Sequence, residues 1–399
     1  MIIEIFKKTR QLLYSAISIR RLGGFLKRVI LYIQRVLIGK KQKKLFVVVD
    51  SFESIILDDI KLRLNFYVPE LTENLFCKVE SVPWIRLIAG DYVMNFKIGV
   101  FTDHILSIFS NSYAVDHRRH VSGWEWVRFV NDYYDYKVDT DLAMSNLRKR
   151  VEMLMPLGYN KSYIFGTGPS LARASSLQWD DGYRIVCNTI VRDLDLFFHI
   201  SPHFVVAGDA VYHFSHTKFA VEFRKDLLIC LQEFGTYFVY PDQFDVMVQR
   251  EFSSVRNQLV PVPVGGHSRV NVNLLIDFRL PALGNVLPLL LIPLACTLSS
   301  RIYMWGFDGR APTDYDSKFW QNSNKQSYPE FMYTLNEAFP YFFEYYVPNN
   351  NSNSYIQNFH GHILDNKLSI AESEGYLFVM MHPSWTKTLQ SRFCDDVNK

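Results

Sequence analysis

Five consecutive residues, Gly166-Thr167-Gly168-Pro169-Ser170, end an apolar run and lead into a helix-like stretch. Glycine supplies the backbone angles of a sharp turn, and proline fits the first helical position, where its missing N–H is not needed. The free N–H groups at such a helix start can bind phosphate. The segment therefore predicts a phosphate-binding turn, although many strand-to-helix turns of this composition bind nothing.

A polar side chain at the end of the next apolar run limits the kinds of ligand that this turn is expected to bind. Asn188 lies there, twenty residues after Gly168. A dinucleotide-binding fold would place an acid at this point and a third glycine where Leu171 stands, so a dinucleotide is disfavoured. An amide both donates and accepts hydrogen bonds. It suits a sugar hydroxyl, a base edge or a phosphate oxygen, or it only caps a turn. Asp209 ends the third apolar run.

Short apolar runs alternate with helical stretches from residue 161 onward. The expected strands cover 161–165, 183–187, 203–208, 236–240 and 301–305. This alternation predicts an α/β protein with a Rossmann-like, doubly wound parallel sheet. Such a sheet binds ligands at the carboxyl ends of its strands, where the polar residues above would lie.

The uncharged stretch 280–300 is long enough to cross a membrane. Its three prolines and its glycine favour a buried helix of the sheet instead.

The motifs between residues 160 and 385 resemble those of the bacterial CMP-sialic-acid sialyltransferases. They also resemble related Kdo- and sialic-acid-type transferases of surface-polysaccharide and flagellin glycosylation. The similar features are the Gly-x-Gly-Pro-Ser-Leu turn, a strand ending in Cys-Asn, a Gly-led turn before an apolar helix, a strand ending in Gly-x-Asp and a C-terminal Gly-His element. Two positions depart from the pattern: Thr167 replaces an asparagine and Asn285 a serine.

The resemblance implies an inverting glycosyltransferase that moves an acidic sugar from CMP to a glycan or glycolipid acceptor. Hydrogen bonds can stabilise the departing phosphate monoester, so no metal or other cofactor is expected. Histidine suits the base that deprotonates the acceptor. His362, after Gly361, is the expected base and His360 the alternative. Tyr315 would contact the phosphate from a mobile lid over 309–357.

The turns and the resemblance together predict a nucleotide-binding set. Its members are Gly166, Thr167, Gly168, Pro169, Ser170, Asn188, Asp209, Gly284, Asn285 and Asp308. His382 follows the last apolar run, and either reaches this site or closes a turn.

The N-terminal part differs in charge from the rest of the chain. Residues 1–45 hold twelve Lys or Arg and one acid, which leaves 31 basic and 39 acidic groups elsewhere. The acidic balance of the motif-bearing part disfavours nucleic-acid binding. A basic amphipathic helix over 1–44 is expected to bind an anionic membrane surface. The protein would then lie peripherally on the cytoplasmic face of a bacterial inner membrane, where the five scattered cysteines stay reduced.

Three segments are expected to organise the chain. They are the helix at 1–44, an N-terminal region of unclear fold at 45–155 and a catalytic domain at 156–399, and the N-terminal region is expected to be α-rich. Within the second, 45–52 reads as a buried strand and 139–155 as a helix capped by Asp139 or Thr140.

Three other functions stay open at this point. Asp-x-Asp pairs at 193–195 and 314–316 could hold a divalent ion in a metal-dependent sugar transferase. A pyrophosphokinase-like enzyme acting on pterins would use a similar Gly-rich turn. A non-catalytic scaffold of a polysaccharide assembly complex would keep the fold without turnover.

Overall fold

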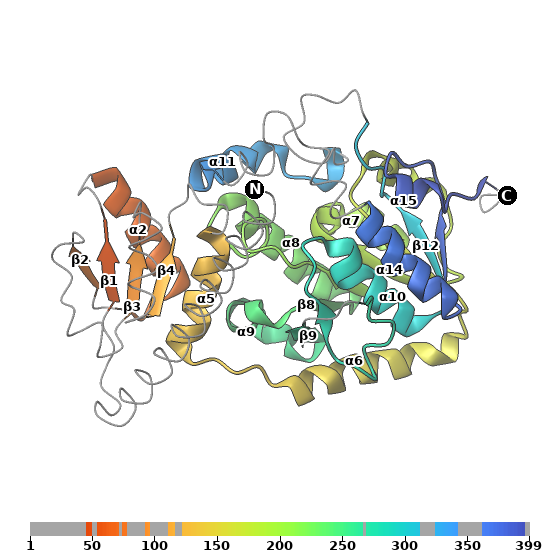
Figure 1. The fold of residues 1–399 in the computed structure, drawn as a ribbon, viewed down its shortest axis with the longest axis horizontal. Helices are drawn as coiled ribbons and strands as arrows, with labels where there is room; N and C mark the ends of the chain where they lie inside the picture. The colour runs from red at the N-terminus through yellow and green to blue at the C-terminus, as the bar shows by residue number, and fades with distance from the viewer. Residues whose placement is uncertain are drawn as a thin grey trace, which may run out of the picture. The chain divides into compact units, whose positions relative to one another are not determined.

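The computed structural model divides the chain into two compact units, Met1–Phe129 and Val130–Lys399, each described by itself (Figure 1). The described residues are 45–49, 54–71, 74–77, 92–95, 111–115, 122–265, 269–311, 324–341 and 361–395. The predicted basic helix at 1–44 lies outside them, as do Tyr315 and His360.

The first unit contains a four-stranded parallel sheet in the order β2-β1-β3-β4. Two helices, α2 and α5, accompany the sheet, and Tyr67 of α2 stacks on Trp126 of α5 with ring centroids 5.0 Å apart. The strand expected at 45–52 is confirmed as β1, but the prediction of an α-rich region missed the sheet. Strands β2, β3 and β4 mix apolar and polar residues within four positions, so they show neither a continuous apolar run nor a clear alternation. The elements are β1 (Leu45–Val48), α2 (Ser54–Tyr67), β2 (Asn74–Cys77), β3 (Tyr92–Asn95), β4 (Asn111–Ala114) and α5 (Ser122–Tyr134).

The second unit is built on a seven-stranded sheet in the order β13-β12-β5-β6-β7-β8-β9. Every neighbouring pair is parallel, so the predicted α/β, Rossmann-like architecture is confirmed. Each strand expected from residue 161 onward is present. The strands are β5 (Ser162–Phe165), β6 (Tyr183–Cys187), β7 (Phe204–Val206), β8 (Tyr237–Pro241), β9 (Leu259–Val262), β12 (Arg301–Trp305) and β13 (Leu377–Met380).

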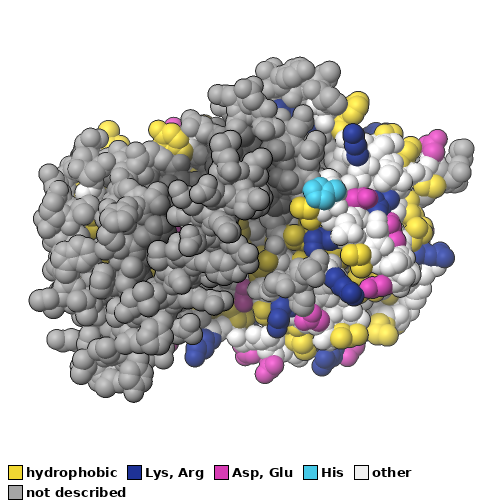
Figure 2. Space-filling model, viewed as in Figure 1, with side chains coloured by type: hydrophobic (Ala, Val, Ile, Leu, Met, Phe, Trp, Pro, Cys, Tyr) yellow, Lys and Arg dark blue, Asp and Glu magenta, His cyan; other side chains and the backbone are white. Residues whose placement is uncertain are grey.

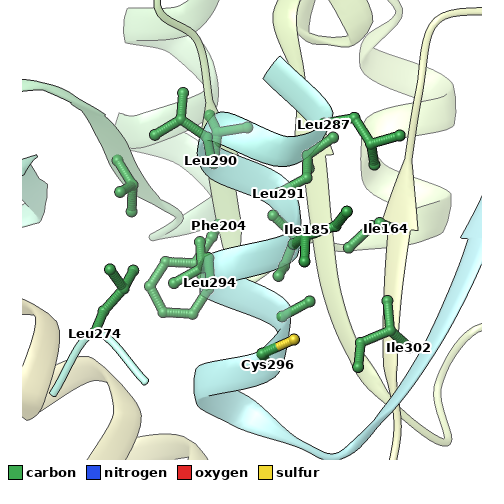
Figure 3. Close-up of a cluster of buried hydrophobic side chains, with 14 of the residues drawn as sticks. Ile164, Ile185, Phe204, Leu274, Leu287, Leu290, Leu291, Leu294, Cys296 and Ile302 are labelled. Atoms are coloured by element: carbon green, nitrogen blue, oxygen red, sulfur yellow. The ribbon is translucent and has the colours of Figure 1, made fainter. Parts of the chain in front are cut away.

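One face of this sheet packs on a buried helical layer. Alternate strand residues such as Ile164, Ile185 and Ile302 point into it and have no exposed surface (Figure 3). The uncharged stretch 280–300 supplies the centre of that layer, which confirms the buried helix. The two helices within residues 280–300, η7 and α10, bury apolar side chains against the strands. The layer comprises α6 (Thr140–Leu154), η7 (Leu287–Leu291), α10 (Ile292–Leu298) and α14 (His362–Ser373).

The opposite face is aromatic. Trp179 packs edge-on against Phe165, with centroids 4.8 Å apart, and against Trp305 at 5.7 Å. Helices on both faces make the sheet doubly wound. The connections between the successive strands β5 to β9 include η3 (Pro169–Ser176), η4 (Asn188–Arg192), α7 (Leu194–Ile200), α8 (Lys218–Phe234) and α9 (Asp245–Glu251).

Helix α6 belongs to the second unit, not to the N-terminal region in which the sequence placed it. Its cap is confirmed, because the Asp139 side chain accepts the N–H of Leu142 at 2.9 Å. Leu147 and Val151 are buried in the core that the seven strands share. The compact unit that contains the seven-stranded sheet thus starts at Val130, before the boundary expected at 155/156.

The topology fixes where a ligand site is expected. After β5 the chain adds β6 to β9 on one side, then returns to place β12 and β13 on the other. The strand order thus reverses between β5 and β12, and open parallel sheets bind ligands outside the carboxyl ends at such a point. Among the described helices, none is long and apolar enough to cross a membrane.

Candidate functional site

The predicted site residues converge on the carboxyl edge of the seven-stranded sheet. The turn at 166–170 follows β5, Asn188 follows β6, Asp209 lies beyond β7 and Asp308 beyond β12. Parallel strands place all four at one edge. On the described part of the face drawn in Figure 2, basic and acidic side chains are interspersed without a patch of one sign.

The turn after β5 is closed by the turn after β12. Gly166 donates its N–H to Trp305 O and Gly168 donates its N–H to Gly306 O, each at 2.8 Å. A Cβ on Gly168 would lie 2.2 Å from the Asp308 carboxylate, and one on Gly306 would lie 2.2 Å from Gly166 O. The glycines are thus required by the approach of two strand ends to each other.

The Asp308 carboxylate occupies the start of η3. The Ser170 N–H donates to it at 3.1 Å, and the Ser170 hydroxyl donates to Asp308 Oδ2 at 2.8 Å. The segment is a 3-10 helix rather than an α-helix, and its N–H at Leu171 bonds back to Gly168 O. The expectation of free N–H groups for a phosphate is wrong at Ser170, because the protein's own acid fills that place.

His382 completes the closed turn. Its Nδ1 lies 2.8 Å from Pro383 O and donates to it, which leaves Nε2 as an acceptor for the Gly306 N–H at 3.0 Å. Ser170 Oγ is 2.8 Å from the same Nε2 and 2.8 Å from Asp308 Oδ2, and it donates its single proton to one of them at a time. Burial lowers the pKa of His382, and the Arg173 guanidinium adds to that effect. His382 therefore closes a turn, which settles the alternative left open by the sequence.

Serine, histidine and aspartate meet here, but they do not form a nucleophilic triad. In a triad the histidine lies between the serine and the acid. Here the Ser170 hydroxyl lies between His382 and Asp308, and Ser170 is buried. The arrangement ties three strand ends together.

The turn after β6 is different. Asn188 has φ of +51°, a left-handed conformation that is uncommon outside glycine. Its side-chain Oδ1 is buried and has no hydrogen-bond partner. An unpaired buried acceptor and a strained backbone at a strand end are both typical of ligand-binding positions.

A second unpaired amide oxygen belongs to a segment that packs on η4, the segment that Asn188 begins. Thr189 Oγ1 donates to the backbone O of Gln326, so the segment around Gln326 packs directly on η4. Gln326 is buried and uses its Nε2 on Asp193, whereas its Oε1 has no partner. The neighbourhood of Asn188 therefore offers two acceptors that lack donors.

The remaining predicted ligands are partly engaged in turns. Asp209 Oδ1 accepts the N–H groups of Val211 and Tyr212, each at 2.8 Å. Burial raises the pKa of Asp209 despite these bonds. Asn285 Oδ1 accepts the Leu287 N–H at 2.9 Å and so begins the helix. Thr167 and Pro169 lie on the surface of the closed turn, partly buried and exposed respectively, and Gly284 is exposed.

His362, the expected base, is exposed at the first position of α14. Because α14 precedes β13 in a parallel sheet, its start lies at the carboxyl edge. The Thr388 hydroxyl donates to Gly361 O at 3.1 Å and fixes this start. The loop before Thr388 carries Trp385, whose side chain is 63% exposed. The sequence reading missed Trp385; its signal was a large aromatic residue in the loop after a final strand.

The described part of the expected lid is anchored. Tyr328 is buried and donates its hydroxyl to Asp226, and burial together with that bond raises its pKa. Arg192 pairs with Glu330 at 2.7 Å. Residues 324–341 therefore form a fixed base, and the rest of the expected lid beyond residue 311 lies outside the described residues.

The described residues contain no cluster of side chains that could hold a metal ion. No three His, Cys, Asp or Glu side chains come together there. Of the Asp-x-Asp pairs, Asp193 caps α7 by accepting the Leu196 N–H at 3.1 Å and also accepts Gln326 Nε2. The pair at 314–316 lies outside the described part.

Two further histidines are buried and neutral. His213 accepts the Asp209 N–H at 3.1 Å, and burial with the nearby Arg224 lowers its pKa to about 3. His203 accepts the Arg184 N–H at 3.0 Å, and burial with Arg184 lowers its pKa to about 3. His203 precedes β7 and so lies at the amino edge, away from the candidate site.

Comparisons with protein families, with curated proteins and with solved structures found no match to this chain.

Proposed function

We propose that the protein is an inverting glycosyltransferase that moves an acidic sugar of the sialic acid or Kdo type from CMP to a glycan or glycolipid acceptor. The single observation that carries the proposal is Asn188. It is a strained residue with an unpaired buried oxygen, at the carboxyl end of a central strand next to the point where the strand order reverses.

The two unpaired oxygens suit a base that carries an amino group, as cytosine does, and the choice of cytosine among such bases rests on the resemblance. Asn188 Oδ1 and Gln326 Oε1 are acceptors, so a ligand must bring donors to satisfy them. The exocyclic amino group of cytosine is such a donor, whereas uracil has a carbonyl at that position. A buried acceptor left unpaired costs about 1–3 kcal/mol, which gives the expected preference for CMP over UMP.

The closed turn changes how the nucleotide would bind. Ser170 and Asp308 bond to each other, so they support the site from behind instead of touching the ligand. Asn188 and Asp209, at the ends of β6 and β7, are the groups that would contact CMP. This is narrower than the ten residues expected from the sequence.

The reaction needs one proton transfer. The acceptor hydroxyl oxygen attacks the anomeric carbon, the bond from that carbon to the CMP phosphate oxygen breaks, and CMP leaves. His362 takes the hydroxyl proton. The membrane location proposed for the enzyme, peripheral on the inner face of the cytoplasmic membrane, rests on the basic segment at 1–44.

A thermal-shift panel tests the donor. With a chelator present, CMP is expected to raise the melting temperature of the full-length protein, and UMP, UDP, GDP and AMP are not. A shift with AMP alone would favour the pyrophosphokinase-like alternative, and a shift that needs a divalent ion would favour the metal-dependent transferase.

A transfer assay tests the base. With a CMP-sugar that passes the binding test, His362→Ala is expected to lower turnover by about 10²–10⁴-fold with CMP binding retained. Full turnover in this variant would remove His362 from the reaction, whereas no turnover by wild type with any CMP-sugar would favour the scaffold.

A further inference from the structure

The loop that follows β13 shows an inverted pattern of burial. Ser384, Thr386 and Thr388 are buried, whereas Trp385 between them is 63% exposed. The hydrophobic effect alone favours the reverse, because an indole is among the largest apolar side chains and a hydroxyl is easily hydrated. The exposure of Trp385 is therefore imposed by the loop.

Hydrogen bonds hold the loop in this conformation. The backbone N–H of Trp385 donates to Asp308 O at 2.7 Å, and the Ser384 hydroxyl donates to Phe307 O at 2.7 Å. Gly309 has φ of +75°, and a Cβ on it would lie 2.6 Å from Thr386 Oγ1. The backbone of the loop is thus fixed to the turn after β12, and the indole projects from a rigid support.

The same loop is tied to the proposed base. Thr388, three residues after Trp385, donates its hydroxyl to Gly361 O at 3.1 Å, and His362 follows directly. Three peptide units span at most about 11 Å, so the backbone at Trp385 lies no further than that from the backbone at Thr388, which makes this contact. Trp385 and His362 are both exposed, at the same edge of the sheet.

We propose that Trp385 is the platform on which a pyranose ring of the acceptor stacks, a proposal that rests on the proposed function. The face of an indole carries negative partial charge and attracts the polarised C–H groups of a sugar face. Stacking there would hold an acceptor hydroxyl next to His362. The nearby chain favours a sugar over a lipid, because its other exposed residues include the polar Lys387 and Gln390 and no further large apolar side chain.

Glycan-array binding by the full-length protein, with CMP present, tests the platform. Wild type is expected to bind at least one class of immobilised oligosaccharide. Trp385→Ala is expected to weaken that binding by at least tenfold, and Trp385→Phe to retain most of it. Phe198→Ala is the matched control, because Phe198 is an aromatic residue that is 72% exposed on α7, and it should bind as wild type.

Three outcomes would overturn the proposal. In the first, wild type binds no glycan. In the second, Trp385→Ala binds glycans as well as wild type does. In the third, Trp385→Ala keeps its glycan binding and loses binding to anionic phospholipid vesicles, which would assign the indole to a membrane. The thermal shift with CMP separates the two proposals. If CMP raises the melting temperature of both wild type and Trp385→Ala but neither protein binds glycans, only the platform proposal fails. If CMP raises the melting temperature of neither protein but glycan binding depends on Trp385, only the donor assignment fails.

Discussion

The turn after β5 and the turn after β6 lie side by side, yet one is closed and the other is open. In the first, Ser170 bonds to Asp308 and the glycines pack against the β12 turn. In the second, Asn188 keeps a strained backbone and an unpaired oxygen. The glycine-rich motif is thus explained by the protein's own packing, whereas the single amide has no internal explanation.

The difference teaches how to weigh the two signals. Glycine at a strand end indicates that something approaches the backbone closely, and here that is another strand end. An unpaired buried polar atom indicates a missing partner. The second observation points to a ligand, and the first does not.

The largest expected effect comes from filling the closed turn. Gly306→Ala puts a Cβ 2.2 Å from Gly166 O at a residue with φ of +81°, so overpacking and backbone strain add. The expected loss is about 3 kcal/mol or more in the free energy of unfolding, measured with urea. Gly235→Ala is the control, since φ is +61° but no atom lies within 4 Å, and it should lose only about 1 kcal/mol. Equal losses would mean that the two strand ends do not meet.

Removing the acid of the closed turn should have the next largest effect. Asp308→Ala leaves the Ser170 N–H and hydroxyl without their acceptor, and a loss of about 2–3 kcal/mol of unfolding free energy is expected. Asp308→Asn should lose less, because it keeps one acceptor. If Asp308 instead bound the nucleotide, both variants would lose CMP affinity and keep wild-type stability.

Acidification should weaken the closed turn through His382. Its pKa is lowered in the folded protein, so the unfolded chain binds more protons below the ordinary value of about 6.5. Stability is therefore present above that pH and is lost as the pH falls, by up to about 1.4 kcal/mol per pH unit for one histidine. His203 and His213 contribute in the same direction.

Unfolding free energies at pH 7, 6 and 5 check this pH dependence. His382→Gln is expected to fall less steeply than wild type over that range, whatever its stability at pH 7. Parallel curves would show that His382 does not titrate with folding.

The smallest expected effect lies at the open turn. Asn188→Gly relieves the left-handed strain and removes the unpaired oxygen, so the free energy of unfolding should stay the same or rise by up to about 1 kcal/mol. Chemical denaturation measures it. A loss of 2 kcal/mol or more would show that the Asn188 side chain supports the fold.

Most of the sheet of the second unit could be predicted because its strands are short, mostly buried and mostly apolar runs that alternate with helices. Of the four strands of the first unit only β1 could be predicted, since it alone is a continuous apolar run. The assignment of α6 failed for another reason: its apolar side, with Leu147 and Val151, does not reveal which core it packs on.

The candidate site was predictable where one residue carries the signal and not where two distant segments meet. Asn188 could be identified from its place at a strand end. The pairing of Ser170 with Asp308 spans a separation of 138 residues, which no local pattern reveals. Trp385 was missed because exposure depends on the hydrogen bonds of its loop with Phe307 and Asp308.

The central claim is that Asn188 belongs to a nucleotide site and not to the fold. Isothermal titration of CMP into wild type and into Asn188→Gly tests it most directly. The account predicts binding to wild type and at least tenfold weaker binding to the variant, with its melting temperature unchanged or higher. Equal CMP affinity in the two proteins, or no CMP binding to wild type, would contradict it.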